Sequence, residues 1–150
     1  MKHNISPRGY LEKVDKVLFI EYEDSKGTFY TLPGGSQKTG EDLRSALRRE
    51  FKEETNLDIE SHEILLVREF ILEKSESLVW KNGIHQIEII FRCSLKNEEQ
   101  TAVTGSVPDN GMKGIIWINK KQIKDLMVYP SKDLINVIGN NEITYLFDRE

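Results

Sequence analysis

The sequence predicts an α/β/α sandwich, in which a mixed β-sheet lies between helices. Strand-like runs rich in Val, Ile, Leu, Phe and Tyr both precede and follow one strongly amphipathic helical segment, and two further helical segments come near the end. No internal repeat, low-complexity tract or Pro/Ser-rich linker interrupts the chain. We therefore expect residues 1–150 to form a single domain.

The predicted strands can be followed along the chain. Residues 10–22 fit one or two strands, and a turn signal at residues 24–27 separates them from a short strand at residues 28–32. The sequence Pro33-Gly34-Gly35 ends that strand. Three more strands are predicted at residues 64–72, 85–95 and 113–118.

The helical segments complete the outer layers of the predicted sandwich. Residues 42–55 have helical periodicity and contain neither Gly nor Pro, and Asn56 stands where a left-handed C-cap is expected. Two terminal helices are predicted at residues 120–127 and 131–138, the second of them just after Pro130.

The composition sets broad limits on function. The chain has 150 residues, of which 38% are hydrophobic, and a net charge of −4. No run approaches the roughly 20 apolar residues that a membrane span needs, and the acidic balance argues against nonspecific binding to nucleic acid. The one cysteine, Cys93, cannot form an internal disulfide and is expected to be a buried, inert thiol. The expected compartment is therefore the reducing cytoplasm.

The central helix carries glutamates where a structural helix would be apolar. At about 100° per residue, one apolar face is defined by Leu43, Ala46, Leu47 and Phe51. Glu50 and Glu54 project into the same sector, and Glu53 flanks it. Like charges on a poorly solvated face are costly, and Arg49 alone neutralises only part of them. Carboxylate oxygens at this spacing suit Mg²⁺ or Mn²⁺.

Glycines surround the entry to this helix. Gly34 and Gly35 follow a predicted strand, and Gly40 precedes Glu41. Glycine permits positive φ and close approach of the backbone. Such a loop can offer a carbonyl to a metal ion or N–H groups to a phosphate.

Residues 35–57 resemble the Nudix box, Gly-x5-Glu-x7-Arg-Glu-U-x-Glu-Glu-x-Gly-U, where U is a bulky aliphatic residue. The positions that match are Gly35, Glu41, Arg49, Glu50, Glu53, Glu54 and Leu57. Phe51 replaces an aliphatic residue and still fills the core, and Asn56 replaces the last glycine at the expected left-handed cap. All the charged positions of the motif are present.

The resemblance implies a Mg²⁺-dependent pyrophosphohydrolase, with Mn²⁺ as the other candidate ion. By position in the motif, Glu50, Glu53 and Glu54 would bind the metal together with the carbonyl of Gly34. Arg49 would hold the carboxylates in place, and Glu41 would fix the loop onto the helix. The implied substrate is a nucleoside diphosphate linked to another group, such as a (d)NTP or an ADP-ribose-like nucleotide sugar.

The general base varies within the resembled family, and two carboxylates outside the motif are candidates. Asp109 lies in the sequence Pro108-Asp109-Asn110-Gly111, where it also fits the role of a turn residue. Glu88 lies in a predicted strand, where its ordinary alternative is an outward-facing residue.

Further polar and aromatic residues are candidates for substrate contacts: Arg8, Tyr30, Arg68, His85 and Glu88. The ordinary alternatives are a solvated surface residue for each arginine, including Arg92, and a satisfied structural residue for His85. Strand aromatics are usually core residues, and this alternative applies to Tyr30, Phe70, Trp80 and Trp117.

Two functions from different classes remain open at this point. The first is an active pyrophosphohydrolase that takes a nucleotide-type small molecule. The alternative is a noncatalytic Nudix-like module that senses a nucleotide for a partner, although such modules usually lose glutamates of the motif. Neither membrane nor nucleic acid is an expected partner, and a homodimer is left open.

Overall fold

The structure is a computed structural model that describes residues 1–73, 82–102, 111–129, 134–139 and 142–149. In chain order, its elements are β1 (Lys2–Lys13), β2 (Lys16–Asp24), β3 (Gly27–Thr31), α1 (Leu43–Thr55), β4 (Ile59–Leu72), β5 (Ile84–Leu95), β6 (Met112–Asn119), the 3₁₀ helix η1 (Lys120–Asp125), β7 (Val128–Tyr129), α2 (Leu134–Ile138) and β8 (Thr144–Arg149). No helix in the described part of the chain is long and apolar enough to cross a membrane.

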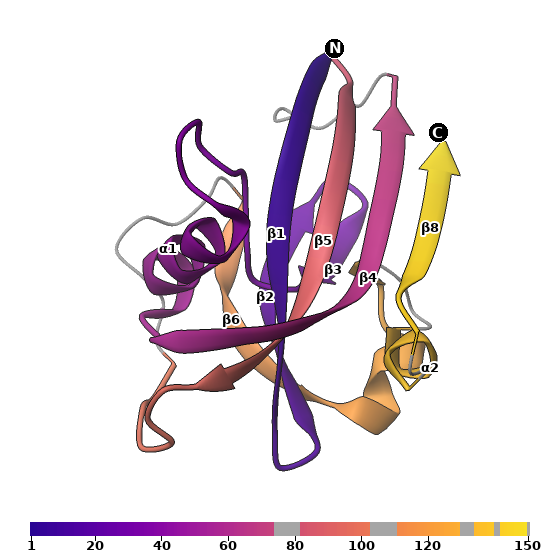
Figure 1. Cartoon of the computed structure of the whole chain (residues 1–150). Helices are drawn as coiled ribbons and strands as arrows, with labels where there is room; N and C mark the ends of the chain where they lie inside the picture. Colours follow the sequence, from indigo (N-terminus) through magenta and orange to yellow (C-terminus); the bar gives the residue numbers. More distant parts are fainter. Residues whose placement is uncertain (74–81, 103–110, 130–133, 140–141, 150) are drawn as a thin grey trace.

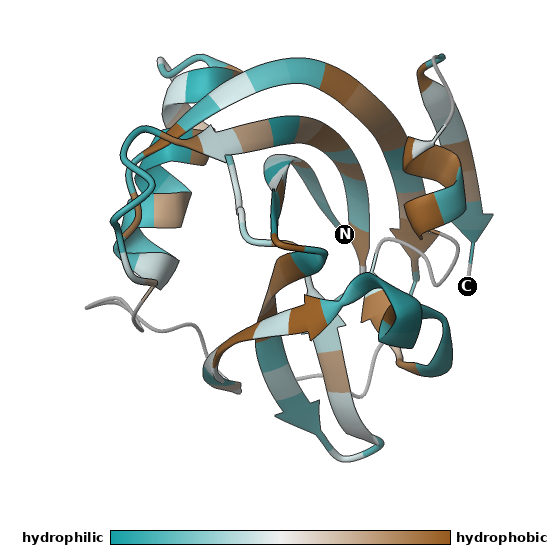
Figure 2. Cartoon of the chain, turned by 90° about the horizontal axis from the view of Figure 1, so that it is seen from below, coloured by the Kyte–Doolittle hydropathy of each residue, from teal (hydrophilic) through white to brown (hydrophobic). Residues whose placement is uncertain are grey.

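The strands form a mixed, strongly curved sheet (Figure 1). Its order is β7-β3-β2-β1-β5-β4-β8, and β6 pairs with β2. The pairs β1·β5, β3·β7 and β4·β8 are parallel, whereas β1·β2, β2·β3, β2·β6 and β4·β5 are antiparallel. Figure 2 shows the long strands arching between α1 on one side and α2 on the other.

Two core clusters occupy the two sides of the sheet. On one side, Leu47 and Phe51 of α1 pack with Leu11 of β1 and Cys93 of β5. On the other side, a larger cluster joins η1 and α2 to the sheet: Ile123, Leu134, Tyr10, Phe19, Leu66 and Ile90 belong to it. Neighbouring residues of a strand therefore alternate between the two clusters, as the pleat requires. The predicted fold class, a mixed sheet between helices, is confirmed.

Several element boundaries differ from the prediction. Residues 10–22, predicted as one or two strands, belong to two, but β1 begins earlier than predicted, at Lys2. The turn between β1 and β2 places Val14 and Asp15 at positive φ. The expected helix at residues 120–127 is the 3₁₀ helix η1, which ends at Asp125, and α2 is described only from Leu134. The edge strand β8 has no counterpart in the prediction.

Candidate active site

Local signals at both ends fix the position of helix α1. The Asp42 side chain accepts a hydrogen bond from the Ser45 N–H at 2.8 Å, which caps the first turn. Asn56 has φ 60°, in the left-handed region, and its N–H donates to the Lys52 carbonyl at 3.1 Å. The expected left-handed cap is therefore confirmed, and the register of every glutamate on α1 follows from it.

The glycine loop after β3 lies directly against β1. The Gly9 N–H donates to the Pro33 carbonyl at 2.9 Å, and the Gly35 N–H donates to the Pro7 carbonyl at 3.2 Å. Gly34 has φ +148°, and a Cβ atom there would fall 2.2 Å from the Pro7 oxygen. Only glycine fits this close antiparallel approach, which brings the loop to the end of α1.

Glu54 and Glu50 both face this loop, as the helical periodicity predicts. Glu54 is 2% exposed, and its Oε1 accepts a hydrogen bond from the Gly34 N–H at 2.9 Å. A Cβ atom on Gly35 would lie only 2.6 Å from the Glu50 carboxyl carbon. The Glu53 side chain lies at the margin, with 36% of its surface exposed.

Arg49 ties the remaining carboxylates of the motif together. Its Nη2 lies 2.5 Å from Glu41 Oε1, and its Nη1 lies 2.9 Å from Glu50 Oε1 and 3.4 Å from Glu53 Oε2. The hydrogen bonds from Arg49 and from the Lys38 N–H lower the pKa of Glu41 to about 2. Hydrogen bonding to Glu41 likewise raises the pKa of Arg49. Glu41 thus fastens the loop to α1 through Arg49.

The donor atoms suit a divalent cation in their chemistry. Glu50, Glu53, Glu54 and the Gly34 carbonyl offer hard oxygen atoms, and Gly35 leaves open the space beside the Glu50 carboxylate. In the described ranges, no three His, Cys, Asp or Glu side chains are already arranged to hold a metal ion. Arg49 instead binds Glu50 and Glu53 in this conformation, so binding a metal requires those carboxylates to turn.

A second polar cluster lies inside the curved sheet, on the face shared with the η1 and α2 core. Glu88 of β5 is 4% exposed, and its Oε1 accepts hydrogen bonds from Arg8 Nε at 3.2 Å and Gln86 Nε2 at 2.9 Å. Its Oε2 lies 3.6 Å from Nη1 of Arg68, which is 8% exposed. The outward-facing alternative for Glu88 and the surface alternative for Arg68 are therefore wrong.

Arg8 links this cluster to the glycine loop. Arg8 and Gly34 form an antiparallel bridge, and Arg8 Nη1 donates to the Leu32 carbonyl at 2.9 Å. Burial disfavours the charge on Arg8, but the nearby carboxylates of Glu88 and Glu54 outweigh it and raise the pKa of Arg8. The structure therefore brings Arg8, Glu88 and Arg68 together, with Arg8 next to the glutamates of α1.

The remaining candidate residues make other contacts or lie outside the described residues. His85 is on the opposite face of β5 from Glu88, where its Nε2 pairs with Glu69 Oε2 at 2.9 Å and its ring meets His3 edge-on. Tyr30 is half-buried and packs against the η1 and α2 core, which favours the core alternative for this residue. Asp109 lies outside the described residues, as does Trp80.

Arg92, Trp117 and Phe70 have the surface or core positions that were the alternatives to substrate contacts. Arg92 is exposed and pairs with Glu63 across β4 and β5. Trp117 packs against the α1 core, and Phe70 is buried beneath the Arg68 guanidinium, 4.3 Å from it.

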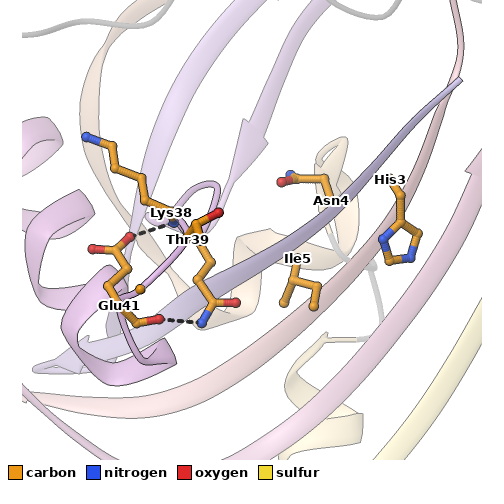
Figure 3. Close-up of a pocket in the computed structure, with 8 residues that line it drawn as sticks. His3, Asn4, Ile5, Lys38, Thr39 and Glu41 are labelled. Atoms are coloured by element: carbon orange, nitrogen blue, oxygen red, sulfur yellow. Dashed lines mark hydrogen bonds between the residues drawn. The ribbon is translucent and has the colours of Figure 1, made fainter.

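A pocket of about 320 Å³ is lined by Glu41, which is bound to Arg49. Figure 3 shows the part of β1 that carries His3, Asn4 and Ile5 beside the loop that carries Lys38, Thr39 and Glu41. The remaining lining residues are Gln37 and Gly40. This pocket was not predicted from the sequence, although its loop is the five-residue spacer of the motif.

Solved structures with the same fold are distant in sequence. The chain superposes on a NUDIX hydrolase from Nitrosomonas europaea with a TM-score of 0.68 at 16% identity, covering 98% of this chain and 80% of that one. It superposes on a MutT protein from Bacillus halodurans with a TM-score of 0.65 at 17% identity, covering 95% and 86%. An ADP-ribose pyrophosphatase from Streptococcus suis gives a TM-score of 0.62 at 16% identity, covering 95% and 98%.

No curated protein matches the sequence. The model of the NUDIX domain family, however, matches residues 10–136, which include the glycine loop, helix α1, Arg68 and Glu88, whereas Arg8 precedes the matched residues. With this match and the shared fold, the chain belongs to the Nudix family.

Proposed function

We propose that this protein is a Mg²⁺-dependent Nudix hydrolase that cleaves a phosphoanhydride bond in a nucleoside diphosphate linked to another group. The observation that carries the proposal is the burial of the Glu54 carboxylate against the Gly34 N–H, beside Glu50. Burying like charges on one helix face is costly unless a cation compensates them. The family match supports the same activity.

The reaction transfers a phosphoryl centre to water. The oxygen of water bonds to one phosphorus, the bridging oxygen leaves with the other product, and a proton passes to solvent. A bound Mg²⁺ ion, or Mn²⁺ in its place, would neutralise developing charge and lower the pKa of a coordinated water. Glu50, Glu53, Glu54 and the Gly34 carbonyl would hold the ion.

The chain's own residues supply orientation around that centre. Arg49 binds Glu41, Glu50 and Glu53 and so restricts the rotamers of the carboxylates. The backbone pairing of Pro33 and Gly35 with β1 fixes the direction of the Gly34 carbonyl. Arg8 stands beside Glu54 with a raised pKa, so it remains a cation that can contact a substrate phosphate.

The substrate class proposed is a (d)NTP or a nucleotide sugar of the ADP-ribose type. Fold neighbours include an ADP-ribose pyrophosphatase, a UDP-X diphosphatase and MutT proteins, so the fold accommodates both types. These neighbours share at most 17% identity with the chain, so both substrate types are included in the proposal.

A substrate panel tests the proposal. Purified protein is incubated with (d)NTPs, ADP-ribose, UDP-sugars and dinucleoside polyphosphates, with Mg²⁺ and with EDTA, and products are identified by mass. We expect Mg²⁺-dependent release of a nucleoside monophosphate from at least one substrate. The control variant Glu63→Gln changes an exposed glutamate on β4 and should release it at the same rate as the wild type. Nucleotide binding without turnover of any panel member would favour the noncatalytic sensing module.

A further inference from the structure

The carboxylate of Glu88 is held between two arginines from neighbouring strands. Arg8 of β1 donates to Oε1 at 3.2 Å, and Arg68 of β4 lies 3.6 Å from Oε2. Gln86, two residues along β5, donates a second hydrogen bond to Oε1 at 2.9 Å. Oε2 is buried and receives no hydrogen bond from any residue that the structure describes. Glu88 is 4% exposed, so its carboxylate lies between the two arginines and does not face open solvent.

Arg68 is itself fixed from two other sides. Its Nε donates to Asp148 of the edge strand β8 at 3.0 Å, and its guanidinium lies 4.3 Å from the centre of the Phe70 ring. A guanidinium with these contacts has little freedom to turn. Glu88 is thus anchored through Arg68 to β4 and β8.

Arg8 is the member of this group that reaches the candidate active site. Its backbone pairs with Gly34, its Nη1 donates to the Leu32 carbonyl, and Glu54 lies near enough to affect its ionisation. A guanidinium has five N–H donors. The bonds to Glu88 and Leu32 use the N–H of Nε and one N–H of Nη1. Among the contacts that the described residues make, none uses Nη2, so its two N–H groups can serve a ligand at the glutamate cluster.

Resting on the proposed function, we propose that Glu88 is a positioning residue, which holds the Arg8 guanidinium where it contacts a substrate phosphate, and that Glu88 is not the general base. A general base must come within hydrogen-bond reach of the attacking water. Glu88 Oε1 is already engaged by Arg8 and Gln86, and Oε2 is buried against Arg68. Its effect on the substrate is therefore transmitted by Arg8.

A double-mutant cycle tests this role without turnover. Binding of inorganic pyrophosphate in the presence of Mg²⁺ is measured by calorimetry for the wild type, Arg8→Ala, Glu88→Gln and the double variant. We expect each single change to weaken binding about tenfold to a hundredfold, the range for a lost charge-assisted hydrogen bond. The double variant should bind no more weakly than Arg8→Ala, because Glu88 acts only through Arg8. Independent, multiplying losses would overturn the proposal.

Steady-state kinetics separates positioning from base catalysis. The Glu88→Asp variant keeps the charge that Arg8 and Arg68 require, so it should fold even if Glu88→Gln does not, while its shorter side chain withdraws the carboxylate from Arg8. Positioning predicts a KM raised about tenfold or more with kcat within a few-fold. A collapse of kcat at unchanged KM would make Glu88 a participant in the chemistry and overturn the inference.

The matched control is Glu63→Gln. Glu63 pairs with Arg92 across the same two strands, β4 and β5, but this pair is exposed. The Glu63→Gln variant should bind pyrophosphate and turn over substrate as the wild type does. If the wild type turns over substrate and the Glu88 variants bind pyrophosphate and turn over substrate equally well, this inference is overturned and the proposed function is not. A wild type that neither binds pyrophosphate nor hydrolyses any panel substrate would overturn the proposed function and this inference with it.

Discussion

The buried carboxylate of Glu54 accepts a hydrogen bond from the backbone N–H of Gly34 at 2.9 Å. This one contact joins the last turn of α1 to the loop that leaves β3. Because the same loop pairs with β1 at Pro7 and Gly9, the contact also sets the distance between the glutamates and Arg8. The geometry of the candidate site therefore depends on residues without functional side chains.

Substitution of the two loop glycines should separate stability from activity. Gly34→Ala introduces a Cβ atom 2.2 Å from the Pro7 oxygen at a positive φ, so we expect a stability loss of about 1–3 kcal/mol. The Cβ atom of Gly35→Ala meets the movable end of Glu50, at 2.6 Å. We therefore expect kcat to fall while the free energy of unfolding changes less than in Gly34→Ala. Urea unfolding and kcat are the measurements. A Gly35→Ala enzyme with wild-type kcat would contradict the placement of Glu50.

The ion pair between Glu41 and Arg49 predicts a defined pH dependence of stability. The hydrogen bond from Arg49 lowers the pKa of Glu41 from 4.5 to about 2 in the folded protein. The contribution of this ion pair to the free energy of unfolding is thus fully present above about pH 4.5 and is lost as pH falls towards about 2. The thermal midpoint of Glu41→Gln should fall less across this range than that of the wild type. The exposed Glu60→Gln control should follow the wild type, and parallel curves for all three would refute the pairing.

The left-handed residue after α1 gives a test of the helix end. Asn56→Gly keeps the required conformation, so the free energy of unfolding should change by less than about 1 kcal/mol. Asn56→Ala should lose about 1–2 kcal/mol because a Cβ atom is unfavourable at φ 60°. Denaturant unfolding of both variants is the measurement. A loss for glycine as large as that for alanine would show that the side chain of Asn56, and not its backbone, stabilises the end of α1.

The single thiol reports on the core between α1 and the sheet. Cys93 is 6% exposed, and burial raises its pKa to about 12. We expect the native protein to react very slowly with a disulfide reagent at pH 8, and rapidly in urea, because thiolate is the reacting form. Complete modification of the native protein within minutes would contradict the packing of β5 against α1.

Local signals made helix α1 and its ends predictable from the sequence. Asp42 and Asn56 are cap residues whose preferences hold in any context, and the helical period alone brings Glu50 and Glu54 to the buried side. The burial of Glu88 and Arg68 was not predictable in this way. Each alternates along a strand, and the face that becomes interior depends on the register with β1 and on the curvature of the sheet.

The edge strand β8 was missed for a related reason. Its large aromatic side chains Tyr145 and Phe147 are exposed, by 60% and 49%, and its contact with a core cluster comes from the partly buried Leu146 between them. Its pairing with β4 is parallel and long-range, and a charged residue, Asp148, adds a contact with the buried Arg68. Neither feature has a signature within the segment itself.

Hydrolysis in ¹⁸O-labelled water by the wild type and by Glu54→Gln tests the central claim most directly. The glutamine carbonyl can still accept the Gly34 N–H, so the variant should keep its thermal midpoint while losing a proposed ligand of the divalent cation. With Mg²⁺, the wild type should place one ¹⁸O atom on a phosphate of one product, and the variant should turn over at least about a hundredfold more slowly. Turnover by Glu54→Gln within a few-fold of the wild type, or products free of ¹⁸O, would contradict the account.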